Sequence, residues 1–429
     1  MSVWPRLERW ASAGGEARVA VVGAGFVGRG LIHRLERTPG MAPALVVNRT
    51  PETAIRCFEL AGRDRTSIVL SDDPAVIEEA VTDNRPVVTS VAEVLEELRC
   101  IEVVVEATGA MDYGARVILG ALRSGKDVVS MNAELDATIG YLLHEEARRA
   151  GAVYTIADGD QPGVLLRQIS FVAGMGFEIV AAVNCKRNLD IHQNPTDSAP
   201  YAARDGTSPL MTTAFGDGTK LQIENAVVAN ATGLIPERRG MHGIATTLEH
   251  AVRDVVSALS SSGVVEYTLG GDFGGGVLVI GRSNDPTVAP YMRYSKLGEG
   301  PDYLFFRPYH LLHFEVPLTI ADVVLDRQSL SLPAGSPHAE VVTVAKRPLE
   351  PGERLDGIGG YACYGHVDTV ERARGFLPIG LAEHAQVVRA VAQDEPVALD
   401  AVELDADAEL VRLRAIQDDM VRSNHRATA

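Results

Sequence analysis

The feature that most constrains this chain is an apolar run that breaks into a glycine-rich turn. Val19–Val22 is followed by glycines in the spacing Gly-x-Gly-x-x-Gly, and apolar residues then recur at helical spacing. Gly23 permits a tight turn, Gly25 lets a pyrophosphate approach the backbone, and Gly28 lets the helix pack close to the strand. The pattern predicts a strand–turn–helix that binds a dinucleotide at the helix N-terminus. The residues expected at the phosphates are Gly23, Gly25, Phe26, Val27 and Gly28.

The end of the next apolar run bears on which dinucleotide is bound. NAD sites usually place Asp or Glu there, where it accepts hydrogen bonds from the ribose hydroxyls. This chain has Asn48, Arg49 and Thr50 instead. An arginine can pair with a 2′-phosphate, so the sequence favours NADP over NAD. The alternative is a solvated arginine beside the start of a helix at Thr50-Pro51.

Length and composition exclude several classes of protein. A chain of 429 residues holds two or three domains. The net charge of −17 makes nucleic acid and anionic membranes poor partners. We find neither an apolar run of the ~20 residues that a membrane span needs nor the apolar core of a signal peptide near Met1. The four cysteines form no CxxC pair, which is typical of a reducing compartment, so we expect a cytoplasmic protein with a small-molecule substrate.

Strand and helix patterns alternate from Val19 to about Ile156, which predicts an α/β fold with a Rossmann-like, doubly wound parallel sheet. The expected domains are a lead-in (1–17), an NADP-binding domain (18–160), an inserted α+β catalytic and dimerisation domain (161–335), and a mainly-β C-terminal domain with a tail (336–429).

Within the middle domain the patterns are mixed. Lys220–Asn225 alternates like a strand, residues 242–260 read as a helix, and Val264–Leu269 and Val277–Ile280 read as strands around a glycine cluster. A further strand ends at Lys186.

Ligands of parallel sheets sit beyond the carboxyl ends of the strands. Two loops expected there could line the nicotinamide side of the cleft, although ordinary turns would use the same residue types. Their residues are Ala107, Thr108 and Gly109, and Asn132 and Glu134. A third loop, Asp158–Gly163, combines two carboxylates, an amide and a rigid turn, and we expect it to belong to a site.

Further motifs extend this pattern over most of the chain. They are Val105-Glu-Ala-Thr-Gly109, Met131-Asn-Ala-Glu-Leu-Asp136, Asp158-Gly-Asp-Gln-Pro162, Asp217-Gly-Thr-Lys220, Val228-Ala-Asn-Ala-Thr-Gly233, Lys296-Leu-Gly-Glu-Gly-Pro301, Pro308-Tyr-His310, His313-Phe-Glu-Val-Pro317, Ala345-Lys-Arg-Pro-Leu-Glu-Pro-Gly352 and Leu355-Asp-Gly-Ile-Gly-Gly360. Together they resemble the deoxyxylulose-phosphate reductoisomerase-like oxidoreductases from about Ala17 to Val411.

That resemblance implies a homoserine-dehydrogenase-like dinucleotide domain, a catalytic α+β domain and a C-terminal SAF domain. It also implies a homodimer that uses NADPH and a divalent cation, in isoprenoid biosynthesis for the best-characterised members. The family pattern Gly-Asn-x-Lys-Gly around the lysine differs here, where Val183 and Arg187 replace the glycines. These bulkier residues are expected to crowd the substrate pocket or change its charge. The substrate of the family is therefore not assigned to this chain.

Hydride transfer to a carbonyl needs a group that polarises the carbonyl and donates a proton, and a lysine can do both. Lys186 is the leading candidate because it leaves an apolar strand and because the related homoserine dehydrogenases rely on a lysine. Asp160 would orient the substrate or bind a metal. Lys220 and Lys296 are further candidates, for catalysis or for an anionic group of the substrate.

An isomerisation before reduction would need a metal, and oxygen ligands suit Mg²⁺ or Mn²⁺. The available side chains are Asp158, Asp160, Asp190, Glu315, His310 and His313, although the histidines fit hydrogen-bonded structure better. No metal ligand is assigned.

The sequence thus predicts an NADP-dependent oxidoreductase that reduces, or isomerises and reduces, a small polyhydroxylated or phosphorylated carbonyl compound. Two alternatives stay open. One is a plain hydroxy-acid or amino-acid dehydrogenase similar to homoserine dehydrogenase, and the other is a protein that senses NAD(P) without catalysis.

Overall fold

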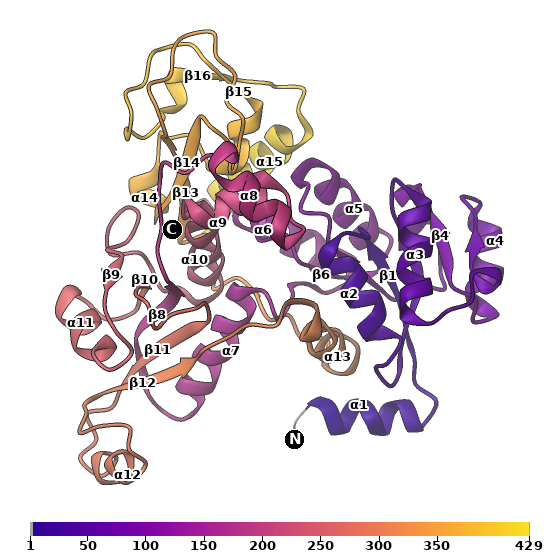
Figure 1. Cartoon of the computed structure of the whole chain (residues 1–429), viewed down its shortest axis with the longest axis horizontal. Coiled ribbons are helices and arrows are strands. Elements are labelled where there is room, and N and C mark those ends of the chain that lie inside the picture. Colours follow the sequence, from indigo (N-terminus) through magenta and orange to yellow (C-terminus); the bar gives the residue numbers. More distant parts are fainter. Residues whose placement is uncertain (1–2, 429) are drawn as a thin grey trace. The chain divides into compact units, whose positions relative to one another are not determined.

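The computed structural model describes residues 3–428 and divides into two compact units (Figure 1). The N-terminal unit comprises Met1–Asp136, Gly140–Asp160 and Leu311–Leu332. The C-terminal unit comprises Ala137–Ile139, Gln161–His310 and Pro333–Ala429.

The N-terminal unit is built on a seven-stranded parallel sheet in the order β3-β4-β2-β1-β5-β6-β7. Its elements are α1 (Val3–Ser12), β1 (Ala17–Val22), α2 (Phe26–Leu35), β2 (Met41–Val47), α3 (Pro51–Ala61), the 3₁₀ turn η1 (Arg65–Ser67), β3 (Val69–Leu70), α4 (Pro74–Thr82), β4 (Val87–Thr89), η2 (Ala92–Glu96), β5 (Val103–Glu106), α5 (Met111–Arg123), β6 (Asp127–Ser130), α6 (Ala133–Ala150), β7 (Tyr154–Ile156), η3 (Leu312–Phe314) and α13 (Val316–Asp326).

The order of this sheet confirms the predicted Rossmann-like architecture. The chain leaves β1 toward β2, β4 and β3 and then returns to β5 on the other side of β1. Because β1 is flanked on both edges and covered by helices, nearly all of its side chains are buried, which is why it reads as a continuous apolar run. The reversal between β1 and β5 is where such sheets open to a ligand.

The two units differ from the sequence-based domain limits, because residues 161–310 and 333–429 form one unit instead of two and further segments are grouped differently. Residues 1–17, expected to be a polar lead-in, contain helix α1, which packs on α13 through Leu7 and an ion pair between Arg6 and Asp326. Residues 311–332, expected in the catalytic domain, group with the N-terminal unit because α13 contributes Val316 and Ile320 to its core.

The C-terminal unit contains a five-stranded mixed sheet in the order β12-β11-β8-β10-β9. Its elements are α7 (Gln161–Gly174), β8 (Glu178–Lys186), α8 (Pro195–Asp205), α9 (Pro209–Gly216), α10 (Thr219–Thr232), β9 (Ile244–Ala245), α11 (Ala251–Ala258), β10 (Val264–Leu269), β11 (Val277–Arg282), α12 (Ala289–Tyr294), β12 (Asp302–Arg307), β13 (Ala339–Ala345), β14 (Cys363–Thr369), α14 (Val370–Ala373), η4 (Ile379–His384), β15 (Ala385–Val387), η5 (Leu399–Ala401), β16 (Val402–Leu404) and α15 (Glu409–Thr428).

Two local predictions in this unit were wrong. Lys220–Asn225, expected to be a strand, lies in the helix α10. This helix is buried over its first eleven residues, and polar side chains such as Thr219 and Gln222 are buried together with the apolar ones, so no amphipathic stripe marks it as a helix. The helix expected over residues 242–260 is limited to α11, because β9 takes its first part. The strands β10 and β11 lie where the sequence predicted them.

Two buried polar side chains of α10 are satisfied by hydrogen bonds from β14. The Thr219 hydroxyl oxygen accepts a hydrogen bond from Gly365 N at 3.0 Å, and the Gln222 side chain accepts one from Val367 N at 2.9 Å. β14 pairs antiparallel with β13, and β15 pairs with β16, so the C-terminal part has the short strands that were expected, followed by the long helix α15.

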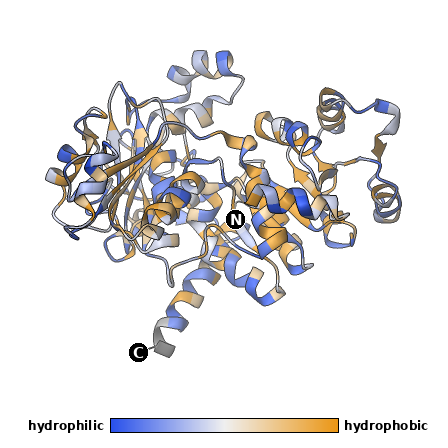
Figure 2. Ribbon diagram, turned by 90° about the horizontal axis from the view of Figure 1, so that it is seen from below, coloured by the Kyte–Doolittle hydropathy of each residue, from blue (hydrophilic) through white to orange (hydrophobic). Residues whose placement is uncertain are grey.

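The distribution of hydrophobic residues agrees with this arrangement of strands and helices. In Figure 2 hydrophobic colouring runs along the strands, while hydrophilic colouring marks the loops and outer helix faces. Within residues 3–428, the structure has no helix with the length and apolar character needed to cross a membrane.

One buried carboxyl makes the stability of the N-terminal unit depend on pH. Asp136 is buried, and the Tyr154 hydroxyl donates a hydrogen bond to its Oδ2 at 3.1 Å. Burial raises the pKa of Asp136 from 3.8 to about 7, against the opposing effect of the tyrosine. Between these two values the unfolded chain has lost the proton that the folded chain keeps. The free energy of unfolding therefore decreases as the pH rises through this window.

We expect Asp136→Asn to remove this dependence, because the amide cannot ionise and still accepts the tyrosine hydrogen bond. The variant should be more stable than the parent at pH 8 by about 1–3 kcal/mol, with little difference near pH 4. Urea unfolding curves at both pH values measure this. A stability difference that is the same at both pH values would contradict the prediction.

Candidate functional site

The glycine turn has the geometry that a bound pyrophosphate requires. Gly23 has φ +102°, and a Cβ there would lie 2.9 Å from the Ala107 carbonyl oxygen. A Cβ at Gly28 would lie 1.8 Å from the Gly23 carbonyl oxygen, so only glycine lets α2 start this close to β1. Gly25, the N-cap of α2, has φ −73° and open space where a Cβ would be. The fold therefore requires glycine at positions 23 and 28, while Gly25 leaves the helix N-terminus open to a ligand.

The other loops expected around the cofactor leave the same edge of the sheet. Ala107–Gly109 follows β5, and the Ala107 amide donates to Val22 O at 2.9 Å, which joins this loop to the end of β1. Phe26 and Val27 form the first turn of α2, and the Phe26 ring is exposed.

Of the residues after β2, Asn48 shapes the turn, whereas the side chain of Arg49 is available to a ligand. The Asn48 amide accepts a hydrogen bond from Ala24 N at 3.1 Å and donates one to Thr50 O at 2.8 Å, so it ties the glycine turn to the start of α3. Arg49 is exposed, and we find no hydrogen bond or ion pair of its side chain within residues 3–428. The guanidinium of Arg49 is therefore free to meet a phosphate beside β2.

Asn132 has a structural task. Its Oδ1 accepts a hydrogen bond from Leu135 N at 3.1 Å as the N-cap of α6, and its side chain is fully buried. Glu134, in the first turn of α6, is also buried. The structure thus places both residues at the sheet edge where they were expected. The side-chain oxygen of Asn132 caps the N-terminus of α6.

Sequence reasoning assigned no role to Glu106, the last residue of β5. Its buried carboxylate accepts a hydrogen bond from Thr108 N at 2.7 Å and another from the Thr108 hydroxyl. Burial raises the pKa of Glu106, and these hydrogen bonds oppose the shift. A carboxylate that ends an otherwise apolar strand is the signal that could have revealed it.

Lys186 is the last residue of β8, at the edge of the sheet formed by the carboxyl ends of β8 and β10. It pairs with Leu269 of β10, and its half-buried Nζ lies 5.4 Å from the centre of the Phe215 ring. Side chains two residues apart on a strand share a face, so Lys186 is on the same face of the sheet as Asn184.

Asn184 joins this face to helix α10. Its Nδ2 donates a hydrogen bond to Glu224 Oε2 at 2.9 Å, and its Oδ1 accepts one from the Gln161 side chain. Gln161 also donates to Gly276 O at 2.8 Å. Lys220 is buried on α10 one turn before Glu224, so it lies on the same helix face. The structure therefore gathers Lys186 and Lys220 on elements linked through one buried amide–carboxylate cluster.

One other candidate lies outside this cluster. Lys296 is exposed with φ +62° in the connection from β11 to β12. That connection lies at the opposite end of the sheet, because Arg282 at the end of β11 pairs with Glu178 at the start of β8 (Figure 1). The structure does not bring Lys296 to Lys186. Asp160 is the last residue before α7.

The expectation that Val183 crowds the substrate pocket was wrong. Val183 is fully buried in the core on the face of β8 opposite Asn184, together with Cys185 and Leu278. Arg187, just past the end of β8, is exposed and does add a positive charge near Lys186.

Several of the possible metal ligands make contacts within the N-terminal unit. The part of the chain that the structure describes contains no group of three or more His, Cys, Asp or Glu side chains that could hold a metal ion. The Asp158 amide donates to the Thr319 hydroxyl at 2.7 Å, and Glu315 accepts from Leu311 N at 2.8 Å. The His313 ring packs on α2 where a Cβ at Gly30 would lie 2.4 Å from it, and burial lowers its pKa.

Comparison with known families assigns both parts of this arrangement. Residues 23–156 match the NAD-binding domain of homoserine dehydrogenase, and residues 159–316 match the catalytic domain of oxidoreductase DRL. Neither match extends beyond residue 316, so the SAF domain, the homodimer and the link to isoprenoid biosynthesis stay predictions.

Solved structures with a similar trace are distant. YvaA of Bacillus subtilis has a TM-score of 0.40 at 12% identity over 75% of this chain and 91% of its own. A 3-ketoreductase from Actinomadura kijaniata, solved with NADP, has a TM-score of 0.38 at 17% identity over 73% and 91%. A DOX-P reductoisomerase has a TM-score of 0.34 at 14% identity over 48% and 56%. These similarities add nothing to the fold described above, and no curated protein sequence matches the chain.

The glycine turn fits a dinucleotide, and the two family matches cover it and the strand that ends in Lys186. The chain is an oxidoreductase that uses a nicotinamide dinucleotide.

Proposed function

We propose that this protein uses NADPH to reduce a small hydroxylated or phosphorylated carbonyl compound, with Lys186 as the proton donor. The observation that carries the proposal is the position of Lys186. It ends β8 beside the buried cluster of Gln161, Asn184 and Glu224, within the segment that matches an oxidoreductase catalytic domain.

When bound, the nicotinamide supplies the hydride. The residues of the chain have to bind the carbonyl compound, polarise its oxygen and deliver a proton to the alkoxide. The ammonium of Lys186 can polarise the carbonyl oxygen and deliver the proton, because its side chain is partly exposed at the carboxyl end of β8, with the Phe215 ring 5.4 Å from Nζ. Lys220, buried on α10, adds a second positive charge from the neighbouring helix for an anionic group of the substrate.

The preference for NADP follows from the end of β2. Asn48 is held within the turn, and the residue that reaches outward is a cation where a carboxylate would select NAD.

The proposal is tested by following NADPH oxidation at 340 nm with a panel of hydroxy-aldehydes, hydroxy-ketones and their phosphates. Turnover with an unrearranged carbon skeleton supports a plain reduction, which product mass spectrometry and NMR establish. If NADPH binds and no carbonyl compound in the panel is reduced, the proposal fails and the sensor alternative is favoured.

We expect Arg49→Glu to weaken NADPH binding by about 10- to 100-fold, because a charge-assisted hydrogen bond is replaced by repulsion. NADH binding should change by less than about threefold, since NADH carries no 2′-phosphate. Isothermal titration calorimetry with both nucleotides gives the two affinities.

Arg99→Glu is the matched control for charge. Arg99 is exposed in the segment that leads into the amino end of β5, at the edge of the sheet away from the glycine turn. The Arg99→Glu variant should bind NADPH and NADH with the same affinities as the parent. Equal losses of NADPH and NADH binding in Arg49→Glu would show that the arginine does not read the 2′-phosphate.

A further inference from the structure

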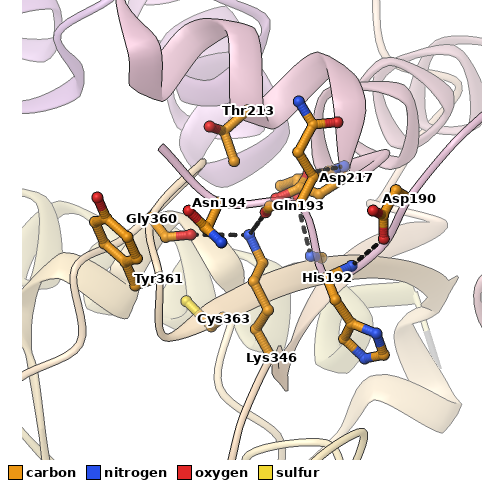
Figure 3. A network of polar contacts seen from close by, with 12 residues as sticks. Asp190, His192, Gln193, Asn194, Thr213, Asp217, Lys346, Gly360, Tyr361 and Cys363 are labelled. Carbon is orange, nitrogen blue, oxygen red and sulfur yellow. Dashed lines mark hydrogen bonds and ion pairs between the residues drawn. The ribbon is translucent and has the colours of Figure 1, made fainter. Parts of the chain in front are cut away.

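Lys346 is a buried cation among the described C-terminal residues that neither family match covers. Lys346 follows β13 and is 4% exposed. Its Nζ donates hydrogen bonds to Gln193 O at 2.7 Å, to Asp217 Oδ2 at 2.8 Å and to Gly360 O at 2.8 Å (Figure 3). An ammonium has three N–H donors, so all of them are used.

The first two acceptors belong to the segments that surround Lys186. Gln193 lies in the loop that follows β8, and Asp217 lies in the turn between α9 and α10. The second oxygen of Asp217 accepts a hydrogen bond from Thr219 N at 2.8 Å, which fixes the start of α10. The two segments also meet directly, because Asp190 N donates to Gly216 O at 2.9 Å.

A series of contacts connects Lys346 to the ammonium of Lys186. Phe215, whose ring lies against Lys186 Nζ, is two residues before Asp217. Gly216 leaves room for the Gln193 side chain, since a Cβ there would lie 2.0 Å from Gln193 Oε1. A shift of the Asp217 turn would therefore move the ring that Lys186 rests against.

We propose that Lys346 is a positioning residue, which holds the loop after β8 and the turn before α10 together and thereby fixes the place of the Lys186 ammonium. The inference rests on the proposed role of Lys186 and gives the C-terminal part of the chain a function in the site. Stability alone is a poor reason to keep such a pair, because well-packed apolar residues of similar volume are often as stable as a buried ion pair. An apolar pair has no N–H donors, so it could not hold two backbone carbonyl groups and the Asp217 carboxylate around one atom, as Lys346 Nζ does.

The test measures how reactive Lys186 is, which does not depend on turnover. Limited acetylation with acetic anhydride, followed by peptide mass spectrometry, gives the labelling of Lys186 relative to the exposed Lys296 at the opposite end of the sheet. The variants are Lys346→Met and the double variant Lys346→Met/Asp217→Asn, which leaves no unpaired buried charge and so keeps the test usable if the single variant does not fold.

In the folded double variant we expect the Lys186 to Lys296 ratio to change by about threefold or more, because the surroundings of Lys186 set its reactivity. NADPH affinity should stay as in the parent. Arg347→Met, which removes the neighbouring exposed ion pair with Glu353, should leave the ratio unchanged. A smaller change of the ratio in the folded double variant, or an equal change in Arg347→Met, would overturn the inference. Failure of Lys186→Met to lower turnover would instead refute the proposed function and leave the labelling result standing.

Discussion

Lys186→Met is expected to lower kcat by about 10²- to 10⁴-fold, the usual contribution of a positioned general acid. The methionine fills a similar volume against the Phe215 ring, so the end of β8 should keep its structure. Binding of NADPH should be unchanged, because the glycine turn belongs to the other unit. The loss should therefore appear as a lower kcat for the same saturating NADPH.

Turnover at saturating NADPH and calorimetric NADPH affinity together measure this effect. Lys296→Met is the matched control, since it removes the same charge from an exposed position at the opposite end of the sheet. It should keep turnover within about twofold of the parent, as exposed positions away from a site usually do. If both variants lose activity alike, Lys186 is not the proton donor. If neither does, the site lies elsewhere.

The second large effect is expected at the glycine turn. Gly28→Ala and Gly25→Ala should both weaken NADPH binding, the first because β1 and α2 must move apart and the second because its methyl group blocks the pyrophosphate. Gly28→Ala places a methyl group 1.8 Å from the Gly23 carbonyl oxygen, so β1 and α2 must move apart. We expect a loss of about 1–3 kcal/mol of stability together with loss of measurable NADPH binding. Thermal melting and calorimetry report the two effects separately.

Gly25→Ala is the informative partner, because its methyl group meets open space and its backbone angle suits alanine. Its stability should fall by no more than about 1 kcal/mol, the cost of a poorer N-cap. NADPH affinity should still drop by about 100-fold or more, since the methyl group occupies the approach of the pyrophosphate. Unchanged NADPH affinity in Gly25→Ala would mean that the dinucleotide does not lie on this turn.

The sequence was most informative where a function depends on local backbone. The turn at Gly23–Gly28 combines a strand, a close approach and a helix start within about ten residues, so its pattern predicts both the structure and the ligand class. The positions of Lys186 and Arg49 at strand ends were predictable for the same reason, because a strand end is marked by the loss of its apolar run.

What the sequence could not predict depends on contacts between distant segments. α10 was mistaken for a strand because Thr219 and Gln222 are satisfied by β14, which lies about 145 residues further along the chain. Lys346 stood in a quoted motif without a predicted role, since its acceptors Gln193, Asp217 and Gly360 come from three separate loops. Lys296 was a further candidate behind Lys186, and the pairing of β11 with β8 places it at the other end of the sheet.

The hydrogen bonds from β14 to α10 also decide how this protein can be divided. A fragment that stopped near Leu332 would contain the whole segment that matches the oxidoreductase catalytic domain. It would also expose the Thr219 and Gln222 side chains and leave the Asp217 carboxylate without its counter-ion. Gene truncation or domain grafting at that boundary is therefore expected to destabilise the start of α10, which depends on these contacts with the last hundred or so residues.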